Sequence, residues 1–196
     1  MQCPERCGQL FAQEETRKLK QALIPGDGCG VGYLVASDES PVKAIVQRNY
    51  CDYAGDMALV RSDGSDWWAP STACSYVDFT EAKLAQIMGR ANHIVPEAIR
   101  EACRQANLPT DEIGTLITNQ PNRIFLRNWR EAVQVPAERH LTTFERHGNL
   151  FGAALPLCLA EAIESGQLKR GDHLVLGGFA HAGDFAAAAV VHWKPH

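Results

Sequence analysis

The chain has 196 residues, of which 45% are hydrophobic, and a formal net charge of -4. This length and composition fit one substantial globular domain or two small ones. The negative charge excludes a generally basic nucleic-acid surface, and no apolar run approaches the roughly 18–20 residues that cross a bilayer. The start, MQCPERCGQLF, has no apolar core of a signal peptide. We therefore expect a cytoplasmic protein that binds neither nucleic acid nor membrane.

Seven cysteines are scattered through the chain. Their odd number and apolar surroundings predict reduced thiols rather than a disulfide framework. Cys3 and Cys7 have the spacing of half a zinc site, but no second Cys/His pair follows at a suitable distance. We therefore expect no metal site.

The first predicted element is a short charged amphipathic helix over residues 13–23, which Pro25 and Gly26 close. A run of alternating glycines, GDGCGVG at 26–32, then passes into a predicted strand at 31–35. A dinucleotide-binding loop has its glycines after a strand and before a helix, so this order argues against one. We expect instead that the missing side chains let a helix or another backbone approach closely.

Residues 42–61 contain two further strand candidates, and a loop at 62–74 carries Trp67 and Trp68. Paired tryptophans here either cover the core, which is the commoner role, or line a ligand entrance.

A long helix follows. Asp78 and Glu81 form a capping box, and apolar residues then keep three-and-four spacing as far as residue 106. This pattern predicts a core helix that Pro96 either kinks or divides in two.

Strands and helices then alternate to the end of the chain. We predict a strand ending at Ile117, a helix over 122–135, a strand, a polar turn and a helix within 140–168, and two strands joined by a Gly/Ala-rich turn within 171–193. Such alternation is typical of a layered α/β domain. The stretch ITNQPN at 117–122 is unusual, because it places polar residues at the inner end of a predicted buried strand.

The segment 143–193 carries a Gly-Asn pair, a proline-bearing helix, a G-x-L-x-x-G-D turn and a Gly-Phe turn. In these features it resembles the C-terminal segment of β-ketoacyl-acyl-carrier-protein synthase III and its acyltransferase relatives, in the thiolase-fold superfamily. NQPN at 119–122 and the glycine run fit the same family, so the resemblance covers about residues 24–196. It implies a thiolase-like layered α-β-α-β-α architecture with a complete C-terminal half at 78–196 and a partial N-terminal half at 1–77.

The resemblance also implies an active-site wall at 117–122. In the family, a strand end supplies a His and a later turn an Asn, and both hydrogen-bond an acyl thioester held on a cysteine. Asn149 matches the family Asn, whereas Asn119 stands where the family has His. An amide can donate a hydrogen bond but cannot act as a base near neutral pH. Acyl transfer to an alcohol, amine or second thiol therefore stands beside carbon–carbon bond formation as an expected reaction.

The family nucleophile is a cysteine at the start of a buried helix, ahead of the glycine-rich strand. No cysteine in the first part of this chain has that strand-to-helix context; those considered are Cys3, Cys7, Cys29, Cys51 and Cys74. A half-domain without the first strands would expose sheet edges and one side of a core. We therefore expect a partner polypeptide that carries the missing N-terminal portion and the nucleophile.

Further candidates surround this site. His181 interrupts a turn that is glycine-only in the family, and it either restores an imidazole to the pocket or points to solvent and closes it. Phe151 is expected to shape the pocket. Three arginines at i, i+4 and i+7 of one helix either bind the phosphate of coenzyme A or a carrier protein, or form a solvated face; they are Arg123, Arg127 and Arg130.

We thus expect a component of a synthase III-like acyltransferase, without a permanent cofactor, that uses acyl-CoA or the acyl-phosphopantetheine of an acyl carrier protein. The alternative is a non-catalytic scaffold that stabilises an active homologue. An independent small-molecule binding module would require a well-folded monomer.

Overall fold

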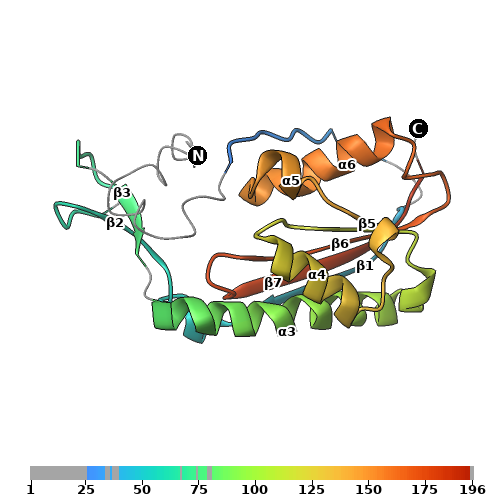
Figure 1. Cartoon of the computed structure of the whole chain (residues 1–196), viewed down its shortest axis with the longest axis horizontal. Coiled ribbons are helices and arrows are strands. Elements are labelled where there is room, and N and C mark those ends of the chain that lie inside the picture. The colour runs from blue at the N-terminus through green and yellow to red at the C-terminus, as the bar shows by residue number, and fades with distance from the viewer. Residues whose placement is uncertain are drawn as a thin grey trace.

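A five-stranded sheet between two layers of helices forms the body of the protein (Figure 1). This computed structural model describes residues 26–33, 36, 40–66, 68–73, 75–78 and 81–194. The predicted helix at 13–23, the pair Cys3 and Cys7, Cys74 and Trp67 lie outside the described residues. The layered α/β class predicted from the alternation of elements is confirmed.

The strands of the large sheet lie in the order β1-β7-β6-β4-β5. Their bounds are Val42–Asn49 for β1, Thr115–Thr118 for β4, His140–Leu141 for β5, His173–Ala180 for β6 and Phe185–His192 for β7. β4 runs parallel to β5 and β6, whereas β7 runs antiparallel to β6 and β1. The carboxyl ends of β4 and β6 therefore share one edge of the sheet, the place where ligands bind in open α/β sheets.

One face of the sheet is covered by α3 (Glu81–Gln105) and α4 (Arg123–Ala132). α3 packs on β1, β7 and β6, and α4 packs beside α3. The apolar face predicted for α3 is buried in the main core, including Ile99. Pro96 lies inside this continuous helix, so the interpretation in which it divides the helix in two is wrong. Burial of the whole face against the sheet outweighs the one backbone hydrogen bond that proline removes.

The N-terminus of α3 also differs from the prediction. The helix begins at Glu81, and Asp78, the expected cap, is the last residue of β3 (Ser75–Asp78). β3 pairs antiparallel with β2 (Ala58–Arg61), and the two form a sheet of their own at one end of the molecule (Figure 1). Residues 79 and 80, between β3 and α3, lie outside the described part of the chain.

The opposite face of the large sheet carries α5 (Phe144–His147) and α6 (Ala154–Glu164). α6 packs on β4, and a second, smaller core lies between them. The buried members of this core are Ile117, Cys158, Ala162, Leu168 and Leu174. Farther along the same face, Ile45 of β1 is 58% exposed. Within the described ranges, no helix covers this face over β1 and β7.

The large sheet crosses the division that we expected at residue 77. β1 comes from the 1–77 segment, yet it pairs with β7 from Val42 to Asn49. β1 of the 1–77 segment and β7 of the 78–196 segment therefore belong to one sheet. Single-turn 3-10 helices connect the elements at Cys51–Tyr53, Thr110–Glu112, Ala137–Arg139 and Phe151–Ala153. None of the helices in the described part is both long enough and apolar enough to cross a bilayer.

Three of the alternating glycines, Gly26, Gly28 and Gly30, lie directly against the α5–α6 layer. A Cβ atom on Gly26 would lie 2.2 Å from the carbonyl oxygen of His147, and one on Gly30 would lie 2.2 Å from Cγ of Pro156. The close approach that the missing side chains predict is therefore confirmed. The predicted strand at 31–35 is not formed at 31–33, and its last two residues lie outside the described part. Strand structure needs a hydrogen-bonded neighbour, which the described residues do not supply here.

We expect Gly26→Ala to loosen this segment. The added methyl group would meet a backbone carbonyl, which cannot rotate away, and overpacking of this kind costs about 1–3 kcal/mol. The hydrogen bond from the Gly26 amide to the Asn149 carbonyl, 2.9 Å long, should then exchange its proton faster. Gly32→Ala is the matched control, since nothing lies within 4 Å of a Cβ at Gly32. An equal exchange rate of the Gly26 amide in both variants would contradict the close packing of Gly26 against His147.

The loop between β2 and β3 is held by Asp63. Its carboxylate accepts hydrogen bonds from the backbone and hydroxyl of Ser65, at 2.9 and 2.7 Å, and from the hydroxyl of Ser71 at 2.8 Å. These hydrogen bonds lower the pKa of Asp63 to about 2. Trp68 in this loop is 67% exposed, so the core-covering interpretation is wrong for this residue.

Candidate active site

An open cavity of about 620 Å³ lies where β4 and β6 end. The polar side chains in its lining are those of Asn119, Asn122, Asn149 and His181. The rest of the lining is mainly apolar and includes Met57, Ile87, Leu155, Leu176, Phe179 and Phe185. A mostly apolar concavity with a few polar groups is the usual form of a small-molecule site. The cavity therefore brings together the residues that the sequence marked from three separate segments.

Asn119 lies just beyond β4 and ties this strand to β6. Its Nδ2 donates to the carbonyl oxygen of Phe179, and its Oδ1 accepts from the backbone N–H of Phe179, both at 3.3 Å. A Cβ on Gly178 would lie 2.7 Å from Asn119 Oδ1, so a larger residue there would have to displace the Asn119 side chain. An amide nitrogen carries two hydrogens, so one of them remains for a ligand. The Asn119 amide thus mainly joins β4 to β6, and one N–H remains that can donate to a ligand in the cavity.

Asn149 is held by its own turn. The preceding Gly148 has a φ of 68°, a left-handed value that favours glycine, and it ends α5. Asn149 Oδ1 accepts from the backbone N–H of Phe151 at 2.9 Å, and its carbonyl accepts from the Gly26 amide at 2.9 Å. Because Oδ1 is occupied in this way, the side-chain NH2 group is the part of Asn149 available to a ligand.

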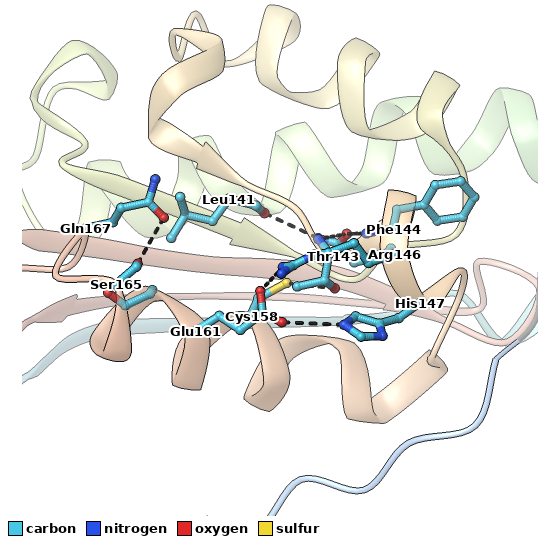
Figure 2. A network of polar contacts seen from close by, with 11 residues as sticks. Leu141, Thr143, Phe144, Arg146, His147, Cys158, Glu161, Ser165 and Gln167 are labelled. Atoms are coloured by element: carbon cyan, nitrogen blue, oxygen red, sulfur yellow. Dashed lines mark hydrogen bonds and ion pairs between the residues drawn. The ribbon is translucent and has the colours of Figure 1, made fainter.

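A polar network holds α5 on α6 immediately before Asn149 (Figure 2). Glu161 of α6 forms an ion pair with Arg146, and its Oε1 lies 3.5 Å from Nε2 of His147. Deeper in the same layer, the hydroxyl of Thr143 lies 3.4 Å from the sulfur of Cys158. These contacts fix the two residues that lead into the Gly-Asn turn. Glu161, which no sequence pattern singled out, therefore helps to position Asn149.

Gln120 supports the fold and is not part of the cavity lining. The side chain is fully buried. Its Oε1 accepts from the backbone N–H groups of Thr143 and Phe144 at 2.9 and 3.0 Å. Its Nε2 donates to the carbonyls of Thr118 and Leu141, both at 3.3 Å. The prediction that all of 117–122 forms an active-site wall is therefore wrong for Gln120, whose amide instead joins β4 to β5 and α5.

Asn122 has a structural task and also lines the cavity. Its Oδ1 accepts from the backbone N–H of Phe125 at 3.0 Å and so caps α4. The polar residues that follow β4 thus have three different structural functions. Asn119 joins β4 to β6, Gln120 joins β4 to β5 and α5, and Asn122 caps α4.

Two non-glycine residues in the cavity lining have left-handed backbones, Phe151 with φ 51° and His181 with φ 55°. Such conformations are uncommon and cluster at functional sites. His181 is 44% exposed, and its Nδ1 lies 3.7 Å from Oδ2 of Asp184. The imidazole is therefore accessible both from the cavity and from solvent.

The three arginines of α4 do not line the cavity. Arg123 forms an ion pair with Glu145 of α5, and Arg127 is exposed. Arg130 is half-buried, and its charge contributes to lowering the pKa of His140. Two of the three arginines are thus surface groups, while the third faces the interior near β5.

His140 is a buried histidine that sequence reasoning did not single out. Its Nε2 lies 3.0 Å from the hydroxyl of Thr118. Burial, and then the charge of Arg130, lower the pKa of His140 to about 4. The ring therefore stays neutral in the folded protein under conditions in which an exposed histidine is charged.

This neutral ring makes stability depend on pH. Between pH 6.5 and about 4, His140 binds a proton in the unfolded chain but not in the folded chain, so unfolding is favoured as the pH falls. The free energy of unfolding should decrease by about 3 kcal/mol across this window because of His140 alone. Urea denaturation at several pH values measures the slope. His140→Gln should flatten it, and an unchanged slope in this variant would contradict the assignment.

The described cysteines do not supply a nucleophile to the cavity. Cys29 and Cys51 are exposed, Cys103 and Cys158 are buried, and none of the four lines the cavity. Burial raises the pKa of Cys103 to about 11 and also raises that of Cys158, which keeps both as thiols. In the described ranges, no group of three or more His, Cys, Asp or Glu side chains could hold a metal ion.

Known proteins share this sequence pattern. Residues 103–193 match the family model of the 3-oxoacyl-[acyl-carrier-protein (ACP)] synthase III C terminal. The chain is 24% identical over 176 residues to a β-ketoacyl-[acyl-carrier-protein] synthase III of Clostridium perfringens, covering 86% of this chain and 52% of the relative. It is 29% identical over 168 residues to the enzyme of that name from Rhizorhabdus wittichii, covering 86% of this chain and 51% of the relative. The chain thus spans about half the length of the curated relatives it matches.

A solved structure shows the same fold. The synthase III of Thermus thermophilus superposes with a TM-score of 0.71 at 23% identity, over 95% of this chain and 55% of that one. The predicted thiolase-like fold is therefore confirmed, and so is the predicted resemblance. Residues 103–193 of this chain are therefore similar to the C-terminal part of the 3-oxoacyl-[acyl-carrier-protein] synthase III family.

Proposed function

We propose that this chain forms one wall of an acyl-thioester pocket in a synthase III-like acyltransferase. The donor is acyl-CoA or the acyl-phosphopantetheine of an acyl carrier protein, and the nucleophilic cysteine belongs to a partner polypeptide. The observation that carries the proposal is the meeting of Asn119 and Asn149 in one largely apolar cavity. Amide N–H groups aimed at a thioester oxygen stabilise the negative charge that develops there during acyl transfer.

Asn149 is the main donor in this proposal. Its Oδ1 is fixed by the backbone of Phe151, so its NH2 group is oriented before substrate arrives. Asn119 contributes its one remaining N–H and gives most of its amide to the backbone of Phe179. Preorganised donors of this kind cost no rearrangement at the moment of reaction.

The uncovered face of the sheet supports a polypeptide partner. The cavity continues along this face over Ile45, Leu176 and Ala189. Contiguous apolar surface that stays open to water is unfavourable, and such surfaces usually mark an interaction site. In the proposal, a helix bearing the reactive cysteine covers this face and narrows the cavity to a pocket. Residues 1–77 then belong to a partial N-terminal half of the thiolase-like fold.

The α4 arginines are proposed to receive the carrier phosphate, and Arg127→Glu tests this. Exposed ion pairs contribute about 0.2–1 kcal/mol each, so charge reversal should weaken binding of octanoylated acyl carrier protein about fivefold. Fluorescence anisotropy of the labelled carrier measures the affinity. The control is Arg170→Glu, an exposed residue just before β6, at the opposite end of that strand from the cavity. Equal affinities for both variants would contradict a role of the α4 arginines in binding the carrier protein.

Mass spectrometry of the protein purified natively, with the polypeptides that accompany it, tests the proposed function. After incubation with octanoyl-CoA, an octanoyl adduct is expected on a partner cysteine, and turnover of the adduct should depend on Asn149. The alternative, a non-catalytic scaffold, predicts a partner that is equally active without this chain. A preparation that forms no adduct at all would contradict the acyltransferase.

A further inference from the structure

Among the described residues that line the cavity, a single side chain can exchange a proton near neutral pH. Of the described residues in its lining, the others are apolar residues, glycines and three asparagines, and only His181 is titratable. The asparagines can donate hydrogen bonds but cannot accept a proton in this pH range. Any proton that moves during chemistry in this part of the cavity therefore has one protein acceptor available, the imidazole of His181.

Asp184 lies where it can orient that imidazole. The two residues belong to the turn between β6 and β7, and Nδ1 of His181 is 3.7 Å from Oδ2 of Asp184. This distance exceeds a hydrogen bond, but catalytic hydrogen bonds are often long before substrate binds. The other oxygen of Asp184, Oδ1, is buried and makes no hydrogen bond within the described part of the chain. With Oδ1 unpaired and Oδ2 next to His181, the Nδ1–H of His181 has little competition as a donor to this carboxylate.

The turn that carries this pair is braced from two sides. Arg90 of α3 donates to the carbonyl of Ala182 at 2.8 Å and to Asp56 Oδ2 at 2.7 Å. On the other side, the backbone N–H of Tyr50 donates to the carbonyl of Asp184 at 2.7 Å. The charge of Arg90 is already paired with Asp56, which leaves the Asp184 carboxylate as the group facing His181. The left-handed backbone of His181 is therefore held in place by contacts outside the turn.

We propose that His181 is the general base of this site and that Asp184 is its positioning residue. This assignment rests on the proposed function, and it limits the acyl acceptors to molecules that carry an O–H, N–H or S–H group. With Nδ1–H directed to Asp184, Nε2 is the basic nitrogen that serves the cavity.

The step balances without a further reactant. The acceptor atom attacks the thioester carbonyl carbon, and its proton passes to Nε2 of His181. The carbonyl oxygen becomes an oxyanion that accepts hydrogen bonds from Asn149. Collapse breaks the carbon–sulfur bond, and the leaving thiolate takes the proton back from Nε2. The products are the acylated acceptor and a free thiol.

The natively purified protein is tested with octanoyl-CoA as donor and N-acetylcysteamine as a thiol acceptor, with octanoyl-N-acetylcysteamine measured by mass spectrometry. His181→Ala should lower kcat about 10²–10⁴-fold, and added imidazole should restore part of it. Asp184→Asn should lower kcat with little change in the KM for octanoyl-CoA, and Asp184→Glu should recover part of the loss. The control is His93→Gln, an exposed histidine on α3 outside the cavity lining.

The outcomes separate this inference from the function on which it rests. A His181→Ala variant that exchanges at the wild-type rate overturns the inference, and if Asn149→Asp is then inactive the proposed function stands. Loss of activity in His181→Ala that imidazole does not restore, together with a raised KM in Asp184→Asn, assigns both residues a merely structural role and also overturns it. If the wild-type protein makes no exchange product, the inference fails, while adduct formation from octanoyl-CoA still reports on the acyl pocket.

Discussion

Asn149→Asp should reduce acyl transfer about 10²–10³-fold and leave the fold unchanged. The substitution keeps the oxygen that accepts the Phe151 amide at 2.9 Å, so the turn is retained. It replaces the NH2 donor with a second oxygen, and loss of one such donor typically costs this much in kcat. The rate of octanoyl transfer by the natively purified protein measures the effect, and circular dichroism confirms that the variant is folded.

The matched control introduces the same charge elsewhere in the cavity. Asn122→Asp keeps the helix cap, because an aspartate oxygen can accept the Phe125 amide as the asparagine does. Its effect on the rate should be much smaller than that of Asn149→Asp. Similar losses in both variants would mean that negative charge in the cavity, rather than the missing donor, slows the reaction.

Gln120→Leu should lower the free energy of unfolding by about 3–5 kcal/mol. The change has nearly the same volume, but it removes the side-chain hydrogen bonds of four buried or part-buried backbone groups, and each bond left unmade costs about 1–3 kcal/mol with incomplete additivity. These groups are the amides of Thr143 and Phe144 and the carbonyls of Thr118 and Leu141. Such a loss is a large part of the roughly 5–15 kcal/mol that stabilises a typical domain.

Two further variants show whether hydrogen bonds or volume cause the loss. Gln120→Glu keeps the shape but turns the donor into an acceptor that faces two carbonyls, so it should be as destabilising as leucine. Gln105→Leu, at the exposed end of α3, should change stability by no more than about 0.5 kcal/mol. Urea denaturation measures the stability of all three variants. A Gln120→Leu variant as stable as Gln105→Leu would contradict the role of the Gln120 amide in joining β4 to β5 and α5.

Periodicity in the sequence predicted the elements that depend on local pattern. The three-and-four spacing of α3 and the apolar runs of β6 and β7 are set by burial of one face or both, so they can be read without knowledge of their neighbours. The prediction of a strand at 31–33 was wrong for the opposite reason. A strand needs a partner strand, and the described residues place none beside it.

The candidate site was predictable in position but not in detail. The resemblance marked Asn119 and Asn149, and the structure places both in one cavity. That the Asn119 amide binds the Phe179 backbone depends on β6 lying beside β4, which is a long-range contact that no local pattern encodes. The same holds for Asp184, whose significance follows only from its distance to His181 and its buried oxygen.

Photo-crosslinking tests most directly whether this chain forms a wall of an acyl pocket. The natively purified protein would be irradiated with an octanoyl-CoA analogue that bears a diazirine on its acyl chain, and the labelled peptides would be sequenced. We expect label on peptides that contain Leu155, Leu176 or Phe179, and we expect unmodified octanoyl-CoA to displace it. Label confined to peptides outside the cavity lining, or label that octanoyl-CoA does not displace, would contradict it.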